Sequence, residues 1–240
     1  MTLPILQHPT YEVYLKSLDK KIKFRPFLVK EEKILLMAKE SAEKESVVDA
    51  IKQIITNCCI DDINVDSLPM FDIEMFFINL RMRSIGETIS LTYKCTKPIP
   101  NSDNICGASN EYELNLENVK YTEFDNHNRD VMLSDTIGIR MKYPRLGNLN
   151  VIKNKSYGDP ALIIAENVEC IYDGDQVYDN QQYTKEELRT FLENLNNSQL
   201  NKLLDFFIYS PKVVIKDTVH CSKCGGEHNL YSEDIYNFFL

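Results

Sequence analysis

A short run near the end of the sequence carries the residue types that bind a metal ion. Cys221 and Cys224 form a Cys-x-x-Cys motif, and Gly225 and Gly226 follow at once. Two thiolates at this spacing can converge on one ion while the glycines let the backbone fold back beneath it, as in a zinc knuckle. A structural zinc site needs four ligands. The motif therefore supplies half of a site.

The other half is expected far upstream, at Cys95 and Cys106, where a glycine again follows the second cysteine. Both cysteine pairs lie next to strand-like runs, so the chain repeats one pattern of strand, two cysteines and return strand. Two facing knuckles make a zinc ribbon, and the sequence predicts one structural zinc ion bound by Cys95, Cys106, Cys221 and Cys224. The ten intervening residues between Cys95 and Cys106 add little free-energy cost to metal binding, because the entropic cost of loop closure grows slowly with loop length.

Two alternatives to this four-cysteine site remain open. His220 and His228 flank the second motif, and either can replace a cysteine as the fourth ligand. The cysteines can also be free thiols without metal. A thioredoxin-type redox pair is disfavoured, because that motif opens a helix and this one opens a glycine turn. Four protein ligands leave zinc no open position, so the expected ion is structural and not catalytic.

The elements before the first cysteine pair are predicted by periodicity. Residues 11–27 alternate between apolar and polar side chains, which is typical of a hairpin. Residues 30–44 and a second run capped by Ser46 have helical spacing. Residues 66–86 form the most apolar helix, expected to be buried. The helix details predicted here are caps at Asp66 or Ser67, Pro69 in the first turn of the buried helix, and burial of Cys58 and Cys59.

The rest of the chain alternates between strands and helices. Thr184 and Glu187 have the spacing of a capping box, and Ser198 is the expected cap of the helix that follows. The predicted strands are 88–95, 111–116, 130–133, 137–143 and 213–219, with a hairpin over 171–178 that turns at Asp173-Gly174 and a helix over 160–168 capped by Asp159.

These elements predict an α+β fold. It has an N-terminal β-hairpin with helices, then central antiparallel strands closed by a zinc-ribbon-like knuckle pair, with the C-terminal helices between the two knuckles. We expect a hairpin and helical domain over 1–87. A strand and zinc-ribbon-like region is expected over 88–240, with an inserted helical segment over about 145–211.

Composition restricts the function. The net charge is -9, from 36 acidic and 27 basic residues, which disfavours binding to a nucleic-acid backbone. No apolar run is long enough to span a membrane, and the N-terminal residues lack the pattern of a signal peptide, so a cytoplasmic protein with reduced thiols is expected. The phosphate-loop, dinucleotide, nucleophile-elbow and metalloprotease motifs are absent from the sequence, and no enzymatic activity is predicted.

One stretch resembles a known family. Residues 23–38 read KFRPFLVKEEKILLMA, which resembles the N-terminal signature of baseplate hub proteins from T4-like contractile-tailed phages. The opening hairpin, the cysteine-bearing strands and the closing Phe238-Phe239 are similar to that family as well. The long gap between Cys95 and Cys106 departs from a compact knuckle.

The resemblance implies a non-enzymatic role as a hub subunit or as a chaperone-like hub-assembly factor. The implied partners are other hub and tail proteins, including the tape measure protein. The implied location is the host cytoplasm during assembly and the baseplate of the virion tail. The competing hypothesis is a zinc-ribbon regulatory protein that binds nucleic acid, and the acidic net charge opposes it.

Overall fold

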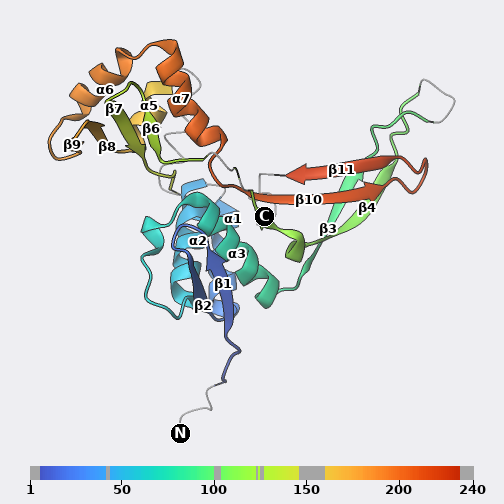
Figure 1. Ribbon diagram of the computed structural model, residues 1–240. Helices are drawn as coiled ribbons and strands as arrows, with labels where there is room; N and C mark the ends of the chain where they lie inside the picture. Colours follow the sequence, from blue (N-terminus) through green and yellow to red (C-terminus); the bar gives the residue numbers. More distant parts are fainter. Residues whose placement is uncertain are drawn as a thin grey trace, which may run out of the picture. The chain divides into compact units, whose positions relative to one another are not determined.

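The computed structural model of the protein describes residues 6–41, 44–99, 104–122, 124, 127–145 and 160–232. Within these residues the chain forms six α-helices, and its strands make four small antiparallel sheets (Figure 1). The α+β class predicted from the sequence is confirmed. No helix in the described ranges is long and apolar enough to cross a membrane. The expected cap Asp159 and the closing Phe238-Phe239 lie outside the described residues.

Contacts divide the chain into two compact units. Unit 1 comprises Met1–Val65, Phe71–Thr122 and Lys212–Leu240, and unit 2 comprises Asp66–Met70 and Glu123–Pro211. Unit 1 therefore includes residues on both sides of position 87. The domain boundary after residue 87 stays a prediction.

Unit 1 begins with the expected hairpin. Strand β1 (Tyr11–Leu15) pairs antiparallel with β2 (Lys20–Phe24), and the turn includes Asp19 at a φ of 46°. Apolar side chains of one face are buried and charged ones of the other are exposed, as alternation requires. The buried residues are Val13, Leu15, Ile22 and Phe24.

The helices of the N-terminal half start at other residues than predicted. Helix α1 (Val29–Ser41) precedes α2 (Lys44–Cys58), so Ser46 lies inside α2 and does not cap it. Lys and Glu are good helix formers, and residues 44–45 extend the helix ahead of the serine. Cys58 at the end of α2 is fully buried, as expected, whereas Cys59 is only partly buried.

The most apolar helix, α3 (Met70–Ser84), is buried along most of its length, as predicted. Its predicted start is wrong. Asp66 and Ser67 belong to a separate 3-10 turn (Val65–Ser67), and Pro69 precedes the helix. Pro69 disfavours a helical backbone conformation at the residue before it, Leu68, and this separates the 3-10 turn from α3.

The Lys23–Ala38 stretch is fixed by a buried carboxylate. Glu31 is fully buried, accepts the Leu28 amide at 2.9 Å and pairs with the Arg25 guanidinium at 3.0 Å. Arg25 also donates to the Asn57 carbonyl at 2.9 Å. Burial acts to raise the pKa of Glu31, but the hydrogen bonds from Arg25 and Leu28 outweigh it and the pKa is lowered.

Unit 2 is a four-stranded sheet with three helices. The strand order is β6-β7-β8-β9, and α5 contacts α6 and α7. The elements are β6 (Asp130–Met132), β7 (Ile137–Met141), α5 (Pro160–Glu166), β8 (Val168–Asp173), β9 (Gln176–Asp179), α6 (Lys185–Glu193) and α7 (Asn197–Ile208). The hairpin of β8 and β9 turns through Gly174, whose φ is 57°.

Of the two caps predicted in the described part of unit 2, one is confirmed. Thr184 and Glu187 form the expected capping box of α6. Helix α7 is capped by Asn196 and not by Ser198, because Asn196 and Gln199 exchange side-chain hydrogen bonds with each other's amides at 3.0 Å. The Asn-x-x-Gln spacing is that of a capping box, and it places Ser198 in the first turn of the helix.

Two further hairpins complete unit 1. Strand β3 pairs with β4, and β10 pairs with β11 and also with β5. The elements are β3 (Thr88–Lys94), β4 (Ser109–Asn115), a 3-10 turn (Leu116–Asn118), β5 (Lys120–Tyr121), β10 (Val213–His220) and β11 (Glu227–Ser232). The Thr122 amide donates to the Lys212 carbonyl at 2.7 Å, which joins the residues on either side of the segment 123–211.

Candidate metal centre

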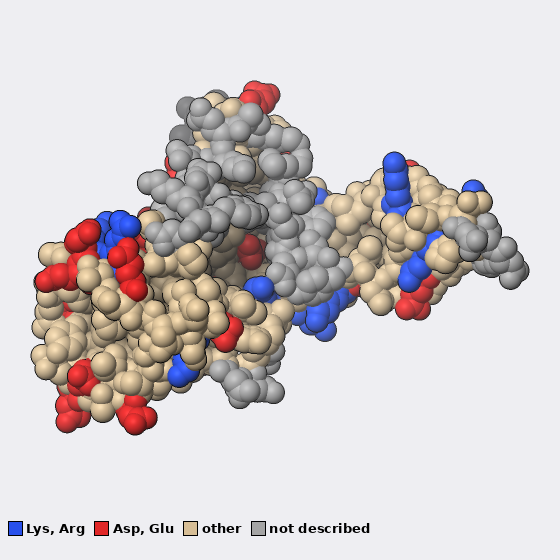
Figure 2. Space-filling model, turned by 90° about the horizontal axis from the view of Figure 1, so that it is seen from above, with Lys and Arg blue, Asp and Glu red and all other residues tan. Residues whose placement is uncertain are grey.

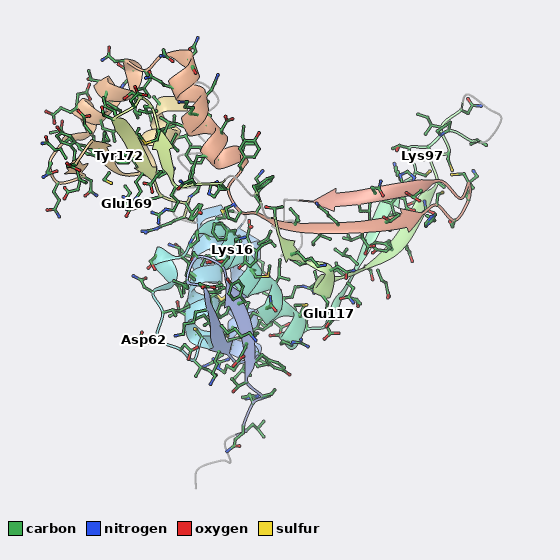
Figure 3. The ribbon with its side chains drawn as sticks, viewed as in Figure 1. Lys16, Asp62, Lys97, Glu117, Glu169 and Tyr172 are labelled. Atoms are coloured by element: carbon green, nitrogen blue, oxygen red, sulfur yellow. The ribbon has the colours of Figure 1, made fainter. Side chains whose placement is uncertain are left out.

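The ends of the two hairpins bring four cysteines together. Cys95 follows β3, Cys106 precedes β4, and Cys221 and Cys224 lie in the turn between β10 and β11. Their four Sγ atoms all lie within 4.8 Å of one another. Figure 3 labels Lys97 at this end of the hairpins.

Two of the sulfur–sulfur distances match the edge of a tetrahedral metal site. The Sγ atoms of Cys95 and Cys224 are 3.6 Å apart, and those of Cys106 and Cys221 are 3.9 Å apart. A tetrahedron with Zn–S bonds of about 2.3 Å has edges of about 3.8 Å. Both distances exceed the length of a disulfide bond, and all four cysteines are free. The four cysteines can hold a metal ion.

The turn of the second hairpin has the backbone of a knuckle. The Cys221 amide donates to the Gly226 carbonyl, and the Gly225 amide donates to the Cys221 carbonyl, both at 2.9 Å. Gly225 has a φ of 70°, which favours glycine. A Cβ on Gly226 would lie 3.0 Å from Cγ of Lys97, so the backbone approaches the other turn closely.

The turn of the first hairpin repeats these hydrogen bonds. The Cys95 amide donates to the Ala108 carbonyl at 2.8 Å, and the Gly107 amide donates to the Cys95 carbonyl at 3.0 Å. Gly107 has a φ of 62°. The Cys106 amide also donates to the Lys97 carbonyl at 2.9 Å. This hydrogen bond brings the two ends of the long segment between Cys95 and Cys106 together. The internal repeat in the sequence is thus a repeated backbone conformation.

Burial and hydrogen bonds act differently on the thiols. Cys95, Cys106 and Cys221 are buried, and Cys224 is partly buried. Burial raises the pKa of Cys95 to about 12, whereas hydrogen bonding by the Cys224 backbone, chiefly, lowers the pKa of Cys221 to about 6. Four thiolates cannot gather in so small a volume without a counter-charge, and a divalent cation would supply it.

Asn110, a residue that the sequence reasoning missed, joins the two turns. This side chain of β4 is buried, and its carbonyl oxygen accepts the amide and the hydroxyl of Ser222 at 2.8 Å each. Its amide lies 3.5 Å from Sγ of Cys221 and can donate to it. The sequence does contain a signal for this role, since Asn110 is a polar residue on the same face of the alternating strand as the buried Leu114.

The two candidate histidine ligands lie in different surroundings. His220 is exposed, and its Nε2 is 3.7 Å from the Glu227 carboxylate. Nε2 of His228 lies 3.1 Å from Sγ of Cys95. Only His228 of the two adjoins the cysteine cluster in the part of the chain that the structure describes.

The comparison with known families decides the identity. A family model described as "T4 bacteriophage base plate protein" matches residues 8–240. The chain belongs to this family. The resemblance read from residues 23–38 is thereby confirmed at the level of a T4-like phage baseplate protein. No curated protein and no solved structure matches the chain.

Membership of the family gives the general role of this baseplate protein. It is a structural protein of the phage tail, located in the tail of the virion, and its partners are other tail proteins. The family indicates a non-enzymatic role. The match includes all four cysteines and both units, so the cluster lies within the sequence that defines the family match.

Proposed function

We propose that this baseplate protein serves the tail hub as a structural or assembly protein that acts through protein–protein contacts and without catalysis. The family match over residues 8–240 carries the proposal. The hub is favoured over other parts of the baseplate by the signature at residues 23–38. The protein would join its partners in the host cytoplasm and then remain in the tail or leave it.

Exposed apolar side chains within the signature support a contact role. Val29, Leu36 and Met37 of α1 are 66%, 54% and 71% exposed. Positions seven and eight residues apart lie on one face of a helix, so these side chains form a row. Solvent-exposed apolar rows are costly unless a partner covers them, and the partner proposed is an apolar surface of a neighbouring hub protein.

The test is capture of an affinity-tagged chain from phage-infected cells, followed by identification of the bound proteins. Hub or tape measure proteins should bind the natural chain and be lost from Leu36→Glu/Met37→Glu. The control is Ile208→Glu, an equally exposed apolar position at the end of α7. Recovery of only host proteins or DNA would overturn the proposal. Mass spectrometry of finished particles then distinguishes a subunit from an assembly factor.

We further propose that Cys95, Cys106, Cys221 and Cys224 bind one structural zinc ion. The support is the gathering of four sulfurs within 4.8 Å of one another where two knuckle turns meet, with two of the sulfur–sulfur distances at 3.6 and 3.9 Å. Zinc bound by four thiolates supplies a redox-inert cross-link between the two hairpins. Elemental analysis should find about one zinc per chain. Iron in its place, or no metal after purification without chelator, would contradict the zinc assignment.

Charge disfavours the alternative of a nucleic-acid-binding zinc ribbon. The chain has a net charge of -9, and Figure 2 shows Asp and Glu side chains interspersed with Lys and Arg on the face in view. A phosphate backbone is bound by the opposite charge. Retention of DNA or RNA by the pure protein that weakens with salt would favour the alternative and weaken the hub proposal.

A further inference from the structure

His228 places a nitrogen atom beside the four sulfurs of the cysteine cluster. The residue lies on β11 opposite Val219, and its Nε2 is 3.1 Å from Sγ of Cys95. Its ring packs against the ring of Tyr93, with centroids 5.3 Å apart. The imidazole is thus held beside one sulfur of the cluster, and a four-coordinate ion has no need of a fifth ligand.

The distance from Nε2 of His228 to Sγ of Cys95 indicates that His228 is a hydrogen-bond donor and not a metal ligand. A nitrogen and a sulfur bound to the same tetrahedral zinc lie about 3.6 Å apart, given bonds of about 2.05 and 2.3 Å. The His228–Cys95 distance of 3.1 Å is shorter than that. A thiolate bound to a cation has no proton to donate, so Nε2 would carry the hydrogen.

Hydrogen bonds reach all four sulfurs, and the Ala108 backbone supplies the one to Cys106. The Asn110 side chain approaches Cys221 at 3.5 Å, the Gly226 amide approaches Cys224 at 3.4 Å, and His228 approaches Cys95. Four thiolates around a divalent ion keep two negative charges in a buried site, which is costly unless donors offset them. Hydrogen-bond donors to the sulfur atoms also hold the cysteine side chains in place before the ion binds.

We propose that His228 is a positioning residue that donates Nε2–H to the Cys95 thiolate and tightens metal binding without being a ligand. The inference rests on the proposed zinc site. Removal of such a partner lowers metal affinity about 10- to 100-fold. Because glutamine keeps an N–H donor, His228→Gln should lose less affinity than His228→Ala.

The experiment measures zinc affinity by competition with a chelating dye, on the full chain. His228→Ala should raise the dissociation constant about 10-fold or more, and His228→Gln should raise it less. The matched control is His220→Ala, since His220 lies on the same hairpin but faces Glu227. It should bind zinc as the natural chain does. Circular dichroism at saturating zinc checks that each variant folds.

Cobalt spectra test the role of the imidazole. Co(II) bound to four thiolates gives charge-transfer bands that should keep their position and intensity in His228→Ala. A change in these bands would mean that His228 is a ligand and would overturn the inference. Unchanged zinc affinity in His228→Ala would overturn it as well, while leaving the zinc site intact. A natural chain that binds neither zinc nor cobalt would remove both proposals.

Discussion

The sharpest stability prediction concerns Asp72, a carboxylate that is fully buried in α3. It accepts the amides of Lys16 and Ser17 at 3.0 and 2.9 Å and the hydroxyl of Tyr121 at 2.7 Å. Figure 3 labels Lys16 in this region. Burial and the charge of Asp72 raise the pKa of Tyr121 far above its ordinary value, so this hydroxyl stays protonated and donates. One side chain therefore joins the first hairpin, α3 and β5.

Asp72→Ala removes the acceptor of three partly buried hydrogen bonds, and of the three donors the Tyr121 hydroxyl can still donate to the Tyr14 carbonyl at 3.3 Å. Each unpaired donor costs about 1–3 kcal/mol, and water that enters the vacated space recovers part of that. We expect a loss of about 2–4 kcal/mol in the free energy of unfolding, because three hydrogen bonds to one carboxylate are lost while the exposed Ser17 amide regains water and the Tyr121 hydroxyl keeps the Tyr14 carbonyl. Tyr121→Phe removes one donor only and should cost about 1.5 kcal/mol, the low end for a hydrogen bond to a charged group.

The assay is urea unfolding followed by circular dichroism, together with hydrogen exchange of the Lys16 and Ser17 amides. Both amides should exchange faster in Asp72→Ala, whereas Tyr121→Phe should change them little. The double variant should cost less than the sum of the single ones, because they share one hydrogen bond. A loss below about 1 kcal/mol in Asp72→Ala, with both amides still protected, would refute the reasoning.

Three further predictions concern the metal, acid and the knuckle turn. Chelation should expose the amides of β3, β4, β10 and β11 to hydrogen exchange and leave unit 2 protected; equal loss in both units would contradict a local cross-link. Against the effect of burial, the hydrogen bonds from Arg25 and Leu28 lower the pKa of Glu31 in the folded state, so its stabilisation is present above the ordinary pKa of a glutamate and is lost as pH falls through the folded pKa. Glu31→Gln should therefore flatten the acid side of the stability curve, and an unchanged curve would argue against the Arg25 pair. Gly225→Ala should cost about 1–2 kcal/mol and weaken zinc binding. Gly174→Ala, with a similar φ in unit 2, should cost the same but leave zinc affinity unchanged; a loss of zinc affinity there would show that strain alone explains the effect.

Local patterns in the sequence predicted local structure well. The alternation of residues 11–27 gave the first hairpin, and the Thr184–Glu187 spacing gave a capping box. The second knuckle followed from its glycines, because a turn with positive φ needs them. Each of these signals lies within a few neighbouring residues, and it is there that side-chain chemistry and backbone conformation are tightly linked.

Long-range contacts were the part that the sequence could not reveal. Asp72 and Tyr121 are far apart in the chain, and so are Asn110 and Ser222, and no periodicity connects them. The same limit left His220 and His228 equivalent, since only the register of β10 and β11 turns the first toward Glu227 and places the second beside Cys95. The sequence predicted Ser198 as the cap of α7, whereas Asn196 caps it, because Gln199 completes a capping box with Asn196.

The hydrogen bonds at the base of the first knuckle have an evolutionary consequence. The Ile99 amide donates to the Asn104 carbonyl, and the Cys106 amide donates to the Lys97 carbonyl. These two hydrogen bonds hold together the two ends of the stretch between residues 99 and 104, independently of the cysteine sulfurs. Residues inserted or deleted between positions 99 and 104 would leave both sulfurs in place. Related phages are then free to vary the length of this stretch. A search that demands a fixed cysteine spacing would overlook relatives that keep the whole cluster.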